Sequence, residues 1–340
     1  MENFFLEYRD PLFGLIVLIT IILMVAILNY AWGVFSKKDD KENIEKFIKK
    51  FENIKNLSQE HLELLRNLNV NSDNLGILAA MMEKNGDFEK SIGIYLIALE
   101  KANSNKEKIY ILTNLGKTYF KAGFLKRSED VLLQSLKLSP RNKEALKLLV
   151  VIYEKLKDFN KALEVLDALR EQDIDVFDEI DYIKIQLISN DNKLNFKEKI
   201  TEILKLKYNF KLAKRFAIEC FIKNCEPLDE FSEFPPLDEC MDLIFNFKRA
   251  VNLQDNEYKA LFCAKNIIKD NQKSKFFEIN MLNLAKNSDL NATLKFKFTC
   301  NNCKNLLPLF FYRCPFCYTL QSVVITPELS EIKDEISQTF

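Results

Sequence analysis

Residues 111–140 read ILTNLGKTYFKAGFLKRSEDVLLQSLKLSP, and a similar apolar spacing returns 34 residues later in ALKLLVVIYEKLKDFNKALEVLDALR, residues 145–170. At this constant offset, six positions of the first stretch fall opposite apolar or small residues of the second: Leu115, Gly116, Tyr119, Leu125, Ser128 and Leu132. A period of 34 residues is typical of repeats built from two helices and a turn. Such a unit cannot bury its apolar face alone, so we expect neighbouring units to stack.

A third copy precedes these two, in NLGILAAMMEKNGDFEKSIGIYLIALE, residues 74–100, at an offset of 37. Gly86 and Gly123 fall at the predicted turns, where glycine adopts left-handed backbone at low cost. Pro140 ends a unit, because proline cannot continue a helix interior. Small residues recur where paired helices would have to approach closely: Ala79, Ser91, Gly116, Ser128 and Ala162.

These features resemble the tetratricopeptide repeat, with its L-G-x-x-Y core, its G-x-F/Y turn and its terminal proline. The resemblance implies an α-solenoid over residues 72–170. The alternative is a helical bundle in which the spacing is coincidental. Residues 171–292 keep helical patterning without this signature, and we interpret them as divergent helical repeats.

Two stretches within this divergent region are predicted helices, FKLAKRFAIECFIKNC at 210–225 and ECMDLIFNFKRAVNL at 239–253. Residues 226–238 are predicted to form a loop, because the prolines at 235 and 236 block helix. Four cysteines of this region match no common metal-ligand spacing, and we interpret them as small buried apolar residues: Cys220, Cys225, Cys240 and Cys263.

The N-terminal part contains LFGLIVLITIILMVAIL, residues 12–28, in which Thr20 is the one polar residue. About 20 apolar residues cross a bilayer as a helix, so we predict a transmembrane helix over 12–35 after a short tail, 1–11. A cleaved signal peptide is the alternative, but the acidic start and the lack of an A-x-A site disfavour it. Lysines crowd the C-terminal flank, which predicts that the bulk of the chain faces the cytoplasm: Lys37, Lys38, Lys41, Lys46, Lys49 and Lys50.

Residues 36–71 are predicted to form juxtamembrane helices or a degenerate repeat, with Ser58 as an N-cap. An amphipathic helix on the membrane surface is the alternative reading of this segment. Lysine plus arginine equals aspartate plus glutamate, 49 each, which gives no electrostatic footprint for nucleic acid. His61 is the single histidine, glycine-rich phosphate loops are absent, and no catalytic set is found. We therefore expect neither an enzyme nor a small-molecule substrate.

Near the C-terminus, FTCNNCKNLLPLFFYRCPFCY (298–318) places four cysteines in two C-x-x-C pairs: Cys300, Cys303, Cys314 and Cys317. Two such turns facing each other provide four thiolates for a tetrahedral metal, as in a zinc ribbon or rubredoxin. We predict a metal ribbon over 293–327 and a tail over 328–340, with zinc as the metal and iron as a possibility.

Two alternatives for the cysteines are a redox C-x-x-C, which favours a βαβ setting, and two disulfides, which need an oxidising compartment. Such turns usually carry glycine after the second cysteine, whereas this chain has Lys304 and Tyr318 there. We therefore expect some backbone strain at both positions. The predicted fold class is mostly α: a transmembrane helix, a tetratricopeptide-like solenoid and a small β ribbon.

By repeat position, the concave face of the solenoid should carry partner recognition. Eight residues are predicted there, although each could equally be an ordinary solvated helix position: Tyr110, Thr113, Lys117, Phe120, Glu144, Lys147, Val151 and Glu154. They do not reproduce the lysine–asparagine clamp by which some such repeats grip a C-terminal carboxylate.

An anchor, tetratricopeptide-like repeats and a terminal four-cysteine ribbon containing YRCPFCYTLQSVVITPEL (312–329) together resemble the lipopolysaccharide assembly protein B family of Gram-negative bacteria. The resemblance implies an inner-membrane adaptor that works with the protease FtsH to control turnover of the deacetylase LpxC, and a ribbon that packs against the repeats. Two other functions stay open. One is an assembly or secretion scaffold with other clients, and the other is a rubredoxin-like electron-transfer protein.

Overall fold

The computed structural model describes residues 18–28, 59–269, 272–286, 288 and 290–331. Of the predicted transmembrane segment, residues 18–28 are described, and they are helical. Among the described residues, no helix combines the length and the apolar character needed to cross a membrane. The predicted tail 1–11, the N-cap at Ser58 and most of segment 36–71 lie outside the described residues.

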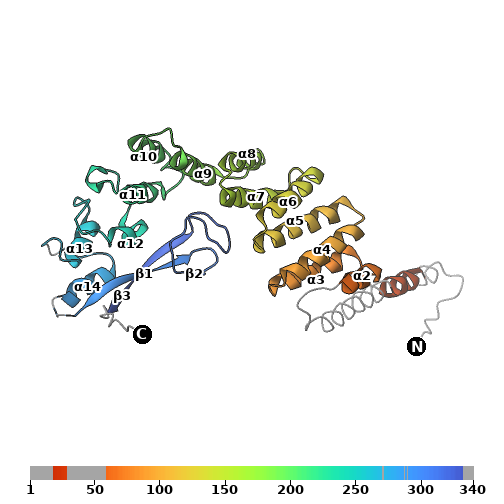
Figure 1. Ribbon diagram of the computed structural model, residues 1–340. Coiled ribbons are helices and arrows are strands. Elements are labelled where there is room, and N and C mark those ends of the chain that lie inside the picture. The colour runs from red at the N-terminus through yellow and green to blue at the C-terminus, as the bar shows by residue number, and fades with distance from the viewer. Residues whose placement is uncertain (1–17, 29–58, 270–271, 287, 289, 332–340) are drawn as a thin grey trace, which may run out of the picture. The chain divides into compact units, whose positions relative to one another are not determined.

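The chain divides into two compact units, residues 1–148 (unit 1) and 149–340 (unit 2), and the boundary falls inside helix α7, Lys143–Leu156. Unit 1 is built of helix pairs, and Figure 1 shows α3 beside α4 and α5 beside α6. Helices α2 to α6 have these bounds: α2 Gln59–Asn67, α3 Ser72–Lys84, α4 Phe88–Lys101, α5 Asn105–Lys121 and α6 Leu125–Leu138.

The turn inside each pair of unit 1 is formed by a glycine in the left-handed region, as predicted. Gly86 has φ +83° and Gly123 has φ +84°. In both turns the glycine N–H donates to a carbonyl three residues back, and the next N–H donates five residues back, to Met82 O and Tyr119 O. This pair of bonds satisfies carbonyls that the end of a helix would otherwise leave without partners.

The small residues of unit 1 allow the close helix contact that the sequence predicts. A Cβ atom added to Gly116 would lie 2.6 Å from Leu132 Cδ2, so no larger residue fits without movement. Ser128 on α6 is fully buried, and its Oγ donates to Gly116 O at 2.7 Å. The pair α5–α6 is therefore held by a packed apolar layer and by buried hydrogen bonds, which include one between the hydroxyls of Thr113 and Ser135 at 3.1 Å.

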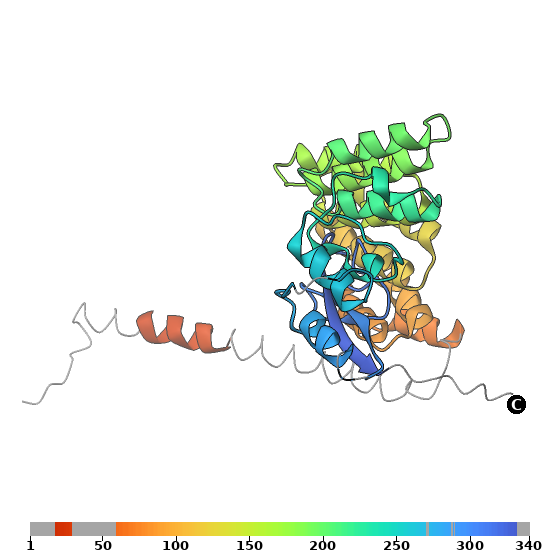
Figure 2. The same cartoon turned by 90° about the vertical axis from the view of Figure 1, so that its left-hand side faces the viewer.

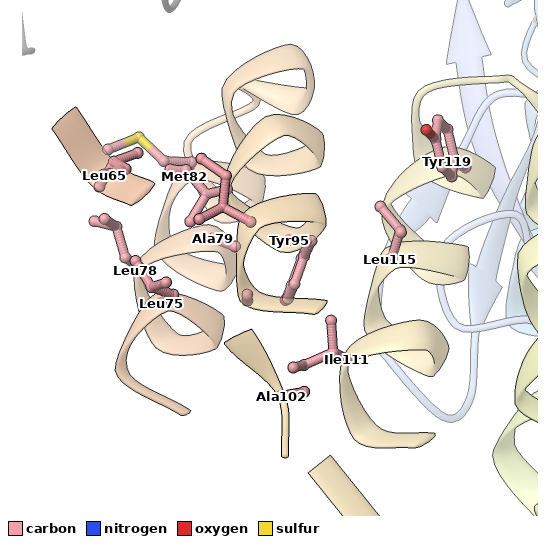
Figure 3. Close-up of a cluster of buried hydrophobic side chains, with 13 residues drawn as sticks. Leu65, Leu75, Leu78, Ala79, Met82, Tyr95, Ala102, Ile111, Leu115 and Tyr119 are labelled. Atoms are coloured by element: carbon pink, nitrogen blue, oxygen red, sulfur yellow. The ribbon is translucent and has the colours of Figure 1, made fainter. Parts of the chain in front are cut away.

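A continuous apolar core joins the helices of unit 1 (Figure 3). Leu65 from α2 lies in it, so the end of the predicted degenerate repeat is part of the stack. Burying each large apolar side chain contributes about 1.5–3 kcal/mol, which makes this core the main source of stability in unit 1. Ten of its side chains are labelled in the figure: Leu65, Leu75, Leu78, Ala79, Met82, Tyr95, Ala102, Ile111, Leu115 and Tyr119.

Unit 2 continues with shorter and less regular helices, and then a small sheet. The helix predicted at 210–225 is found as α11. The helical elements after α7 have these bounds: α8 Phe159–Arg170, α9 Phe177–Asn190, α10 Phe196–Lys205, α11 Ala213–Lys223, η1 Leu228–Glu230, η2 Leu237–Glu239, α12 Met241–Ile244, α13 Asn256–Ala264 and α14 Phe277–Lys286.

The prediction of one helix over 239–253 is wrong, because α12 ends at Ile244. Side chains from other helices take the carbonyls that a longer helix would use. Lys265 Nζ donates to the carbonyls of Phe245 and Phe247, and Arg215 Nη1 donates to Glu239 O at 2.8 Å. A lysine at carbonyls beyond the last helical turn satisfies them in place of helix N–H groups, and the chain turns away.

Unit 2 also uses left-handed turns at its helix ends, but without glycine. Lys157 has φ +58° and falls 34 residues after Gly123. Its N–H donates to Glu154 O, and the next N–H donates to Tyr153 O, as in the glycine turns of unit 1. Three further residues occupy left-handed positions just after α8, α11 and α13: Asp173, Cys225 and Asn266.

The C-terminal sheet is antiparallel, with strand order β2-β1-β3. The long strands β1, Ala292–Cys300, and β3, Val323–Glu331, pair along their whole length, and β2 is Leu306–Leu307. Strand β3 thus runs four residues beyond 327, where the ribbon was predicted to end. Helix α14 packs against β1 and β3, and Figures 1 and 2 both show the three side by side.

Candidate metal centre

The two C-x-x-C pairs form turns with the same hydrogen-bond pattern. In the first, Lys304 N donates to Cys300 O at 2.9 Å, and Cys300 N donates to Asn305 O at 3.0 Å. In the second, Tyr318 N donates to Cys314 O at 2.9 Å, and Cys314 N donates to Thr319 O at 3.0 Å. We call these turns knuckle 1 (300–305) and knuckle 2 (314–319). Their equivalence places two pairs of thiols opposite each other.

The expected strain is present in both knuckles. Lys304 has φ +61° and Tyr318 has φ +60°, at the positions where glycine is usual. A non-glycine residue in this region costs about 1–2 kcal/mol. The knuckle conformation therefore has a local cost in conformational free energy, which the contacts around the knuckles must offset.

The four sulfur atoms lie within 4.8 Å of one another, so the predicted ligands are brought together. Cys300 Sγ is 3.5 Å from Cys317 Sγ, and Cys303 Sγ is 3.6 Å from Cys314 Sγ. A tetrahedron with metal–sulfur bonds of about 2.3 Å has edges of about 3.8 Å, which these distances approach. A disulfide would need about 2.05 Å. The donor set fits a tetrahedral thiolate metal.

Hydrogen bonds prepare two of the sulfurs for the thiolate state that a metal requires. Burial raises the pKa of Cys300, but a hydrogen bond with the Ser322 side chain and donors from backbone N–H groups outweigh it, and the net shift is downward. For Cys317, burial is likewise outweighed, by donors that include Thr319, and its pKa falls to about 6. Burial instead raises the pKa of Cys314 to about 12, so metal binding must displace its proton.

The loop between the knuckles docks onto helices of unit 2 through Tyr312. Its hydroxyl is buried, and burial raises its pKa well above the usual value. Its ring centroid lies 5.5 Å from that of Phe216, 5.9 Å from that of Tyr182 and 6.0 Å from that of Phe210. Aromatic rings at these spacings contribute about 0.5–1.5 kcal/mol per pair beyond their buried area.

A buried ion pair holds Arg313, the next residue of the loop, in place. Arg313 Nε donates to Glu154 Oε2 at 2.6 Å, and the two side chains are 9% and 17% exposed. Tyr182 Oη also donates to Glu154, at 3.2 Å, and Arg313 Nη1 donates to Tyr318 O at 2.9 Å. The pair thus ties α7 and α9 to knuckle 2. Removing one partner of a buried pair typically costs about 3–5 kcal/mol.

Further contacts complete this docking. Arg215 on α11 is 1% exposed, and its Cζ lies 3.4 Å from the centroid of Phe310. The same guanidinium donates to both carboxylate oxygens of Asp242, at 2.6 and 2.8 Å. Gln321, which follows knuckle 2, accepts from Lys211 N at 2.7 Å and donates to Asp178 at 3.3 Å. The ribbon is therefore an integral part of unit 2.

One carboxyl group beside this docking site has a strongly shifted pKa. Burial, with the neighbouring Asp178 carboxylate, raises the pKa of Glu179 to about 8. The Arg313 charge opposes this shift but does not cancel it. Asp178 keeps a lowered pKa despite its burial, because hydrogen bonds that include one from Gln321 stabilise its charge. Glu179 thus holds its proton more tightly in the folded protein than an exposed carboxyl group does.

The structure places the eight predicted recognition residues in three different settings. Thr113, Phe120 and Val151 are buried, so they do not belong to an exposed surface. Thr113 instead accepts from Asn142 Nδ2 at 2.8 Å, next to Ser135. Glu154 holds the ribbon, as described above. The remaining four are at least partly exposed, and all lie in unit 1: Tyr110, Lys117, Glu144 and Lys147.

The docking residues were missed by sequence reasoning. Within KNLLPLFFYR, β2 ends at Leu307, and the aromatic residues that follow contact helices of unit 2. The alternation of apolar and polar residues could not distinguish a docked loop from a buried strand, because both consist of apolar residues. Of the four other cysteines, Cys240 and Cys263 are buried as predicted, whereas Cys225 is exposed and Cys220 is half-buried.

The described residues thus define a mostly helical, tetratricopeptide-like repeat fold with a small C-terminal sheet and a four-cysteine cluster. No family model matches the chain, and no curated relative matches it. Similar solved structures include MamA from Desulfovibrio magneticus RS-1, at 16% identity over 46% of this chain and 86% of that one, with a TM-score of 0.36.

Two further structures are similar at the same level. YrrB, a tetratricopeptide repeat protein with an unusual peptide-binding site, is 17% identical over 53% of this chain and 84% of its own, with a TM-score of 0.34. A tetratricopeptide repeat protein from Parabacteroides merdae is 19% identical over 72% and 98%, with a TM-score of 0.33. At TM-scores below 0.5, the assignment rests on the helix pairs and the cysteine geometry themselves.

Proposed function

We propose that this chain is a non-catalytic adaptor whose helical repeats bind protein partners and whose ribbon holds a structural zinc ion. The observation that carries the proposal is an exposed apolar patch on stacked helices of unit 1. Ile77, Met81 and Tyr110 are 48%, 47% and 51% exposed. The Tyr110 ring lies beside α3, since its Cε1 would be 3.6 Å from a Cβ at Gly76. We call these three residues the apolar patch.

Charged side chains lie on α5, the helix that carries Tyr110, and at the start of α7. Lys117 Nζ pairs with Glu144 at 2.7 Å, and both remain partly exposed. A few large exposed apolar residues ringed by polar groups are typical of protein-binding surfaces. In the ribbon, a bound zinc would supply a cross-link between the two knuckles through Cys300, Cys303, Cys314 and Cys317.

We further propose that the adaptor acts at the bacterial inner membrane, anchored by residues 12–35 with its bulk in the cytoplasm. Its proposed clients are the protease FtsH and the deacetylase LpxC, whose turnover it would control in lipid A synthesis. The support is the sequence resemblance at the repeat core and at residues 312–329. A scaffold for other membrane complexes is the competing assignment.

Capture of partners from detergent extracts tests the client assignment. Tagged full chain should retain FtsH and LpxC, and depletion of the protein should change LpxC abundance. The double variant Met81→Ala/Tyr110→Ala should lose capture by about tenfold or more, because exposed anchors dominate such interfaces. The matched control is Tyr208→Ala, an 84% exposed tyrosine on unit 2. Equal loss in the control, or neither client in the eluate, would contradict the proposal.

A rubredoxin-like electron carrier is a second candidate, because the same four-sulfur geometry fits iron. Metal analysis of protein purified without added metal separates the two. Zinc at about one equivalent supports the structural role. Iron, with visible thiolate-to-metal absorbance and a reversible redox couple, would support the electron carrier instead.

A further inference from the structure

The four ligands of the proposed metal are unequally protected. Cys300 and Cys314 are fully buried, whereas Cys303 and Cys317 are half-buried. We call Cys303 and Cys317 the outer ligands. Solvent, chelators and alkylating reagents reach these sulfurs first, so loss of a metal would begin at an outer ligand.

Each outer ligand has a polar side chain two residues further along the chain that reaches its sulfur. Asn305 Nδ2 donates to Cys303 Sγ at 3.4 Å. Thr319 Oγ1 lies 3.4 Å from Cys317 Sγ. Asn305 and Thr319 hold equivalent places, because their carbonyls accept from Cys300 N and Cys314 N in the two knuckles. The same arrangement, a polar side chain beside the sulfur of an outer ligand, therefore occurs in both knuckles with different residues.

Asn302 of knuckle 1 fixes the direction of the Thr319 hydroxyl in knuckle 2. Its Nδ2 donates to Thr319 Oγ1 at 2.9 Å. The amide occupies a lone pair of the hydroxyl oxygen, which leaves the hydroxyl proton available to Cys317. A metal-bound thiolate carries no proton and can only accept, so the hydroxyl is then the donor.

We propose that Asn305 and Thr319 are positioning residues that set how fast the metal leaves, by hydrogen-bonding to the sulfur atoms of the outer ligands. The inference rests on the metal site of the proposed function. Four thiolates on a divalent ion leave a net charge of −2 beside a buried interior, and donors to sulfur stabilise it. Changes to such partners of metal ligands typically alter metal affinity by 10–100-fold.

The test uses zinc-loaded full chain, a colorimetric zinc chelator and timed alkylation by N-ethylmaleimide, read for each cysteine by mass spectrometry. Thr319→Val keeps the shape of the side chain and removes the hydroxyl. It should speed zinc transfer to the chelator roughly tenfold, with Cys317 alkylated first. Asn305→Ala should do the same with Cys303 alkylated first. The control is Thr326→Val, on an exposed strand residue, which should match the wild type.

Asn302→Ala supplies a second measurement, because it acts through Thr319. The double variant with Thr319→Val should be less than additive in its release rate. The inference is overturned if Thr319→Val and Asn305→Ala leave the release rate within twofold of the wild type. It is also overturned if both accelerate alkylation of all four cysteines equally, which indicates a loosened ribbon. Wild-type protein without any bound metal would instead refute the metal site itself.

Discussion

The two units end their helices with the same backbone turn but with different residues in it. Unit 1 places Gly86 and Gly123 in the left-handed position, whereas unit 2 places Lys157, Asp173 and Cys225 in equivalent positions. The hydrogen bonds across these turns are alike. A repeat geometry can therefore persist after its glycine signature is lost, at a cost of about 1–2 kcal/mol for each non-glycine residue.

The two units also have different cores, and the core of unit 2 offsets the conformational cost of its non-glycine turns. Unit 1 stacks apolar residues from consecutive helices, with contacts between neighbours in sequence. Unit 2 buries Arg215 together with the pair Glu154–Arg313, and it fills its centre with rings that include Tyr312 of the ribbon. We infer that unit 1 is stabilised by its own repeats, while unit 2 needs the folded ribbon.

The strongest test of this contrast is Cys314→Ser, which removes a buried cysteine of the proposed metal site. Structural zinc sites contribute about 10–16 kcal/mol of apparent binding energy, so the ribbon should unfold. Hydrogen exchange should then show lost protection in β1–β3 and also in α9 and α11, with α3–α6 unchanged. Cys225→Ser, at an exposed cysteine, is the control. Lost protection confined to 293–327 would mean that unit 2 does not depend on the ribbon.

A smaller perturbation breaks the docking contact and leaves the ligands in place. Arg313→Ala should destabilise unit 2 by about 3–5 kcal/mol, because it leaves Glu154 buried without its cation. Lys117→Ala breaks an exposed pair in unit 1 and should cost about 0.2–1 kcal/mol. Denaturant unfolding followed by intrinsic fluorescence measures both. Similar costs for the two variants would remove the distinction between the units.

The pH dependence of stability should also differ between the units, because Glu179 lies in unit 2. Its folded pKa of about 8 is above the usual 4.5, so the folded state binds the proton more tightly than the unfolded state. Stability from this group is complete below pH 4.5 and is lost as pH rises through 8. Glu179→Gln should raise the Tm at pH 8.5 by roughly 2–4 °C and leave it nearly unchanged at pH 5. An equal shift at both pH values would contradict the assignment.

The smallest expected effects come from changing the residue in one left-handed turn of each unit. Lys157→Gly should stabilise unit 2 by about 1 kcal/mol, since glycine adopts φ near +58° without strain. Gly123→Ala should destabilise unit 1 by a similar amount, and open space around that position excludes a steric cause. Opposite signs in the two melting curves would confirm that backbone conformation alone separates these turns.

Local sequence patterns were sufficient to predict the helix pairs of residues 72–138 and the clustering of the four C-terminal cysteines. Residues 72–138 carry the signature directly, through Gly86, Gly123 and the buried small residues, and the C-x-x-C spacing brings four sulfurs together. The strain at Lys304 and Tyr318 was also foreseen. These features are local, since each depends on residues only a few positions apart or on a regular repeat.

The family resemblance implied that the ribbon packs against the repeats, but the residues that dock it could not be predicted from local patterns. Arg313 and Glu154 are 159 residues apart, and neither lies in a pattern that marks it as buried. Helix α12 was predicted too long for the same reason, because Arg215 and Lys265, from distant segments, bind carbonyls on either side of it. Thr113, Phe120 and Val151 of the predicted recognition residues are buried, because repeat position gives the helix face only approximately.

The long sequence separation of the docking contacts has a consequence for synthesis on the ribosome. Glu154 emerges before its partner Arg313, and at about 5–20 residues per second it waits roughly 8–30 s. During that interval unit 1 has all of its described core residues available, whereas α9 and α11 expose the rings that Tyr312 later covers. The nascent chain therefore exposes these aromatic side chains until Tyr312 is translated and docks against them.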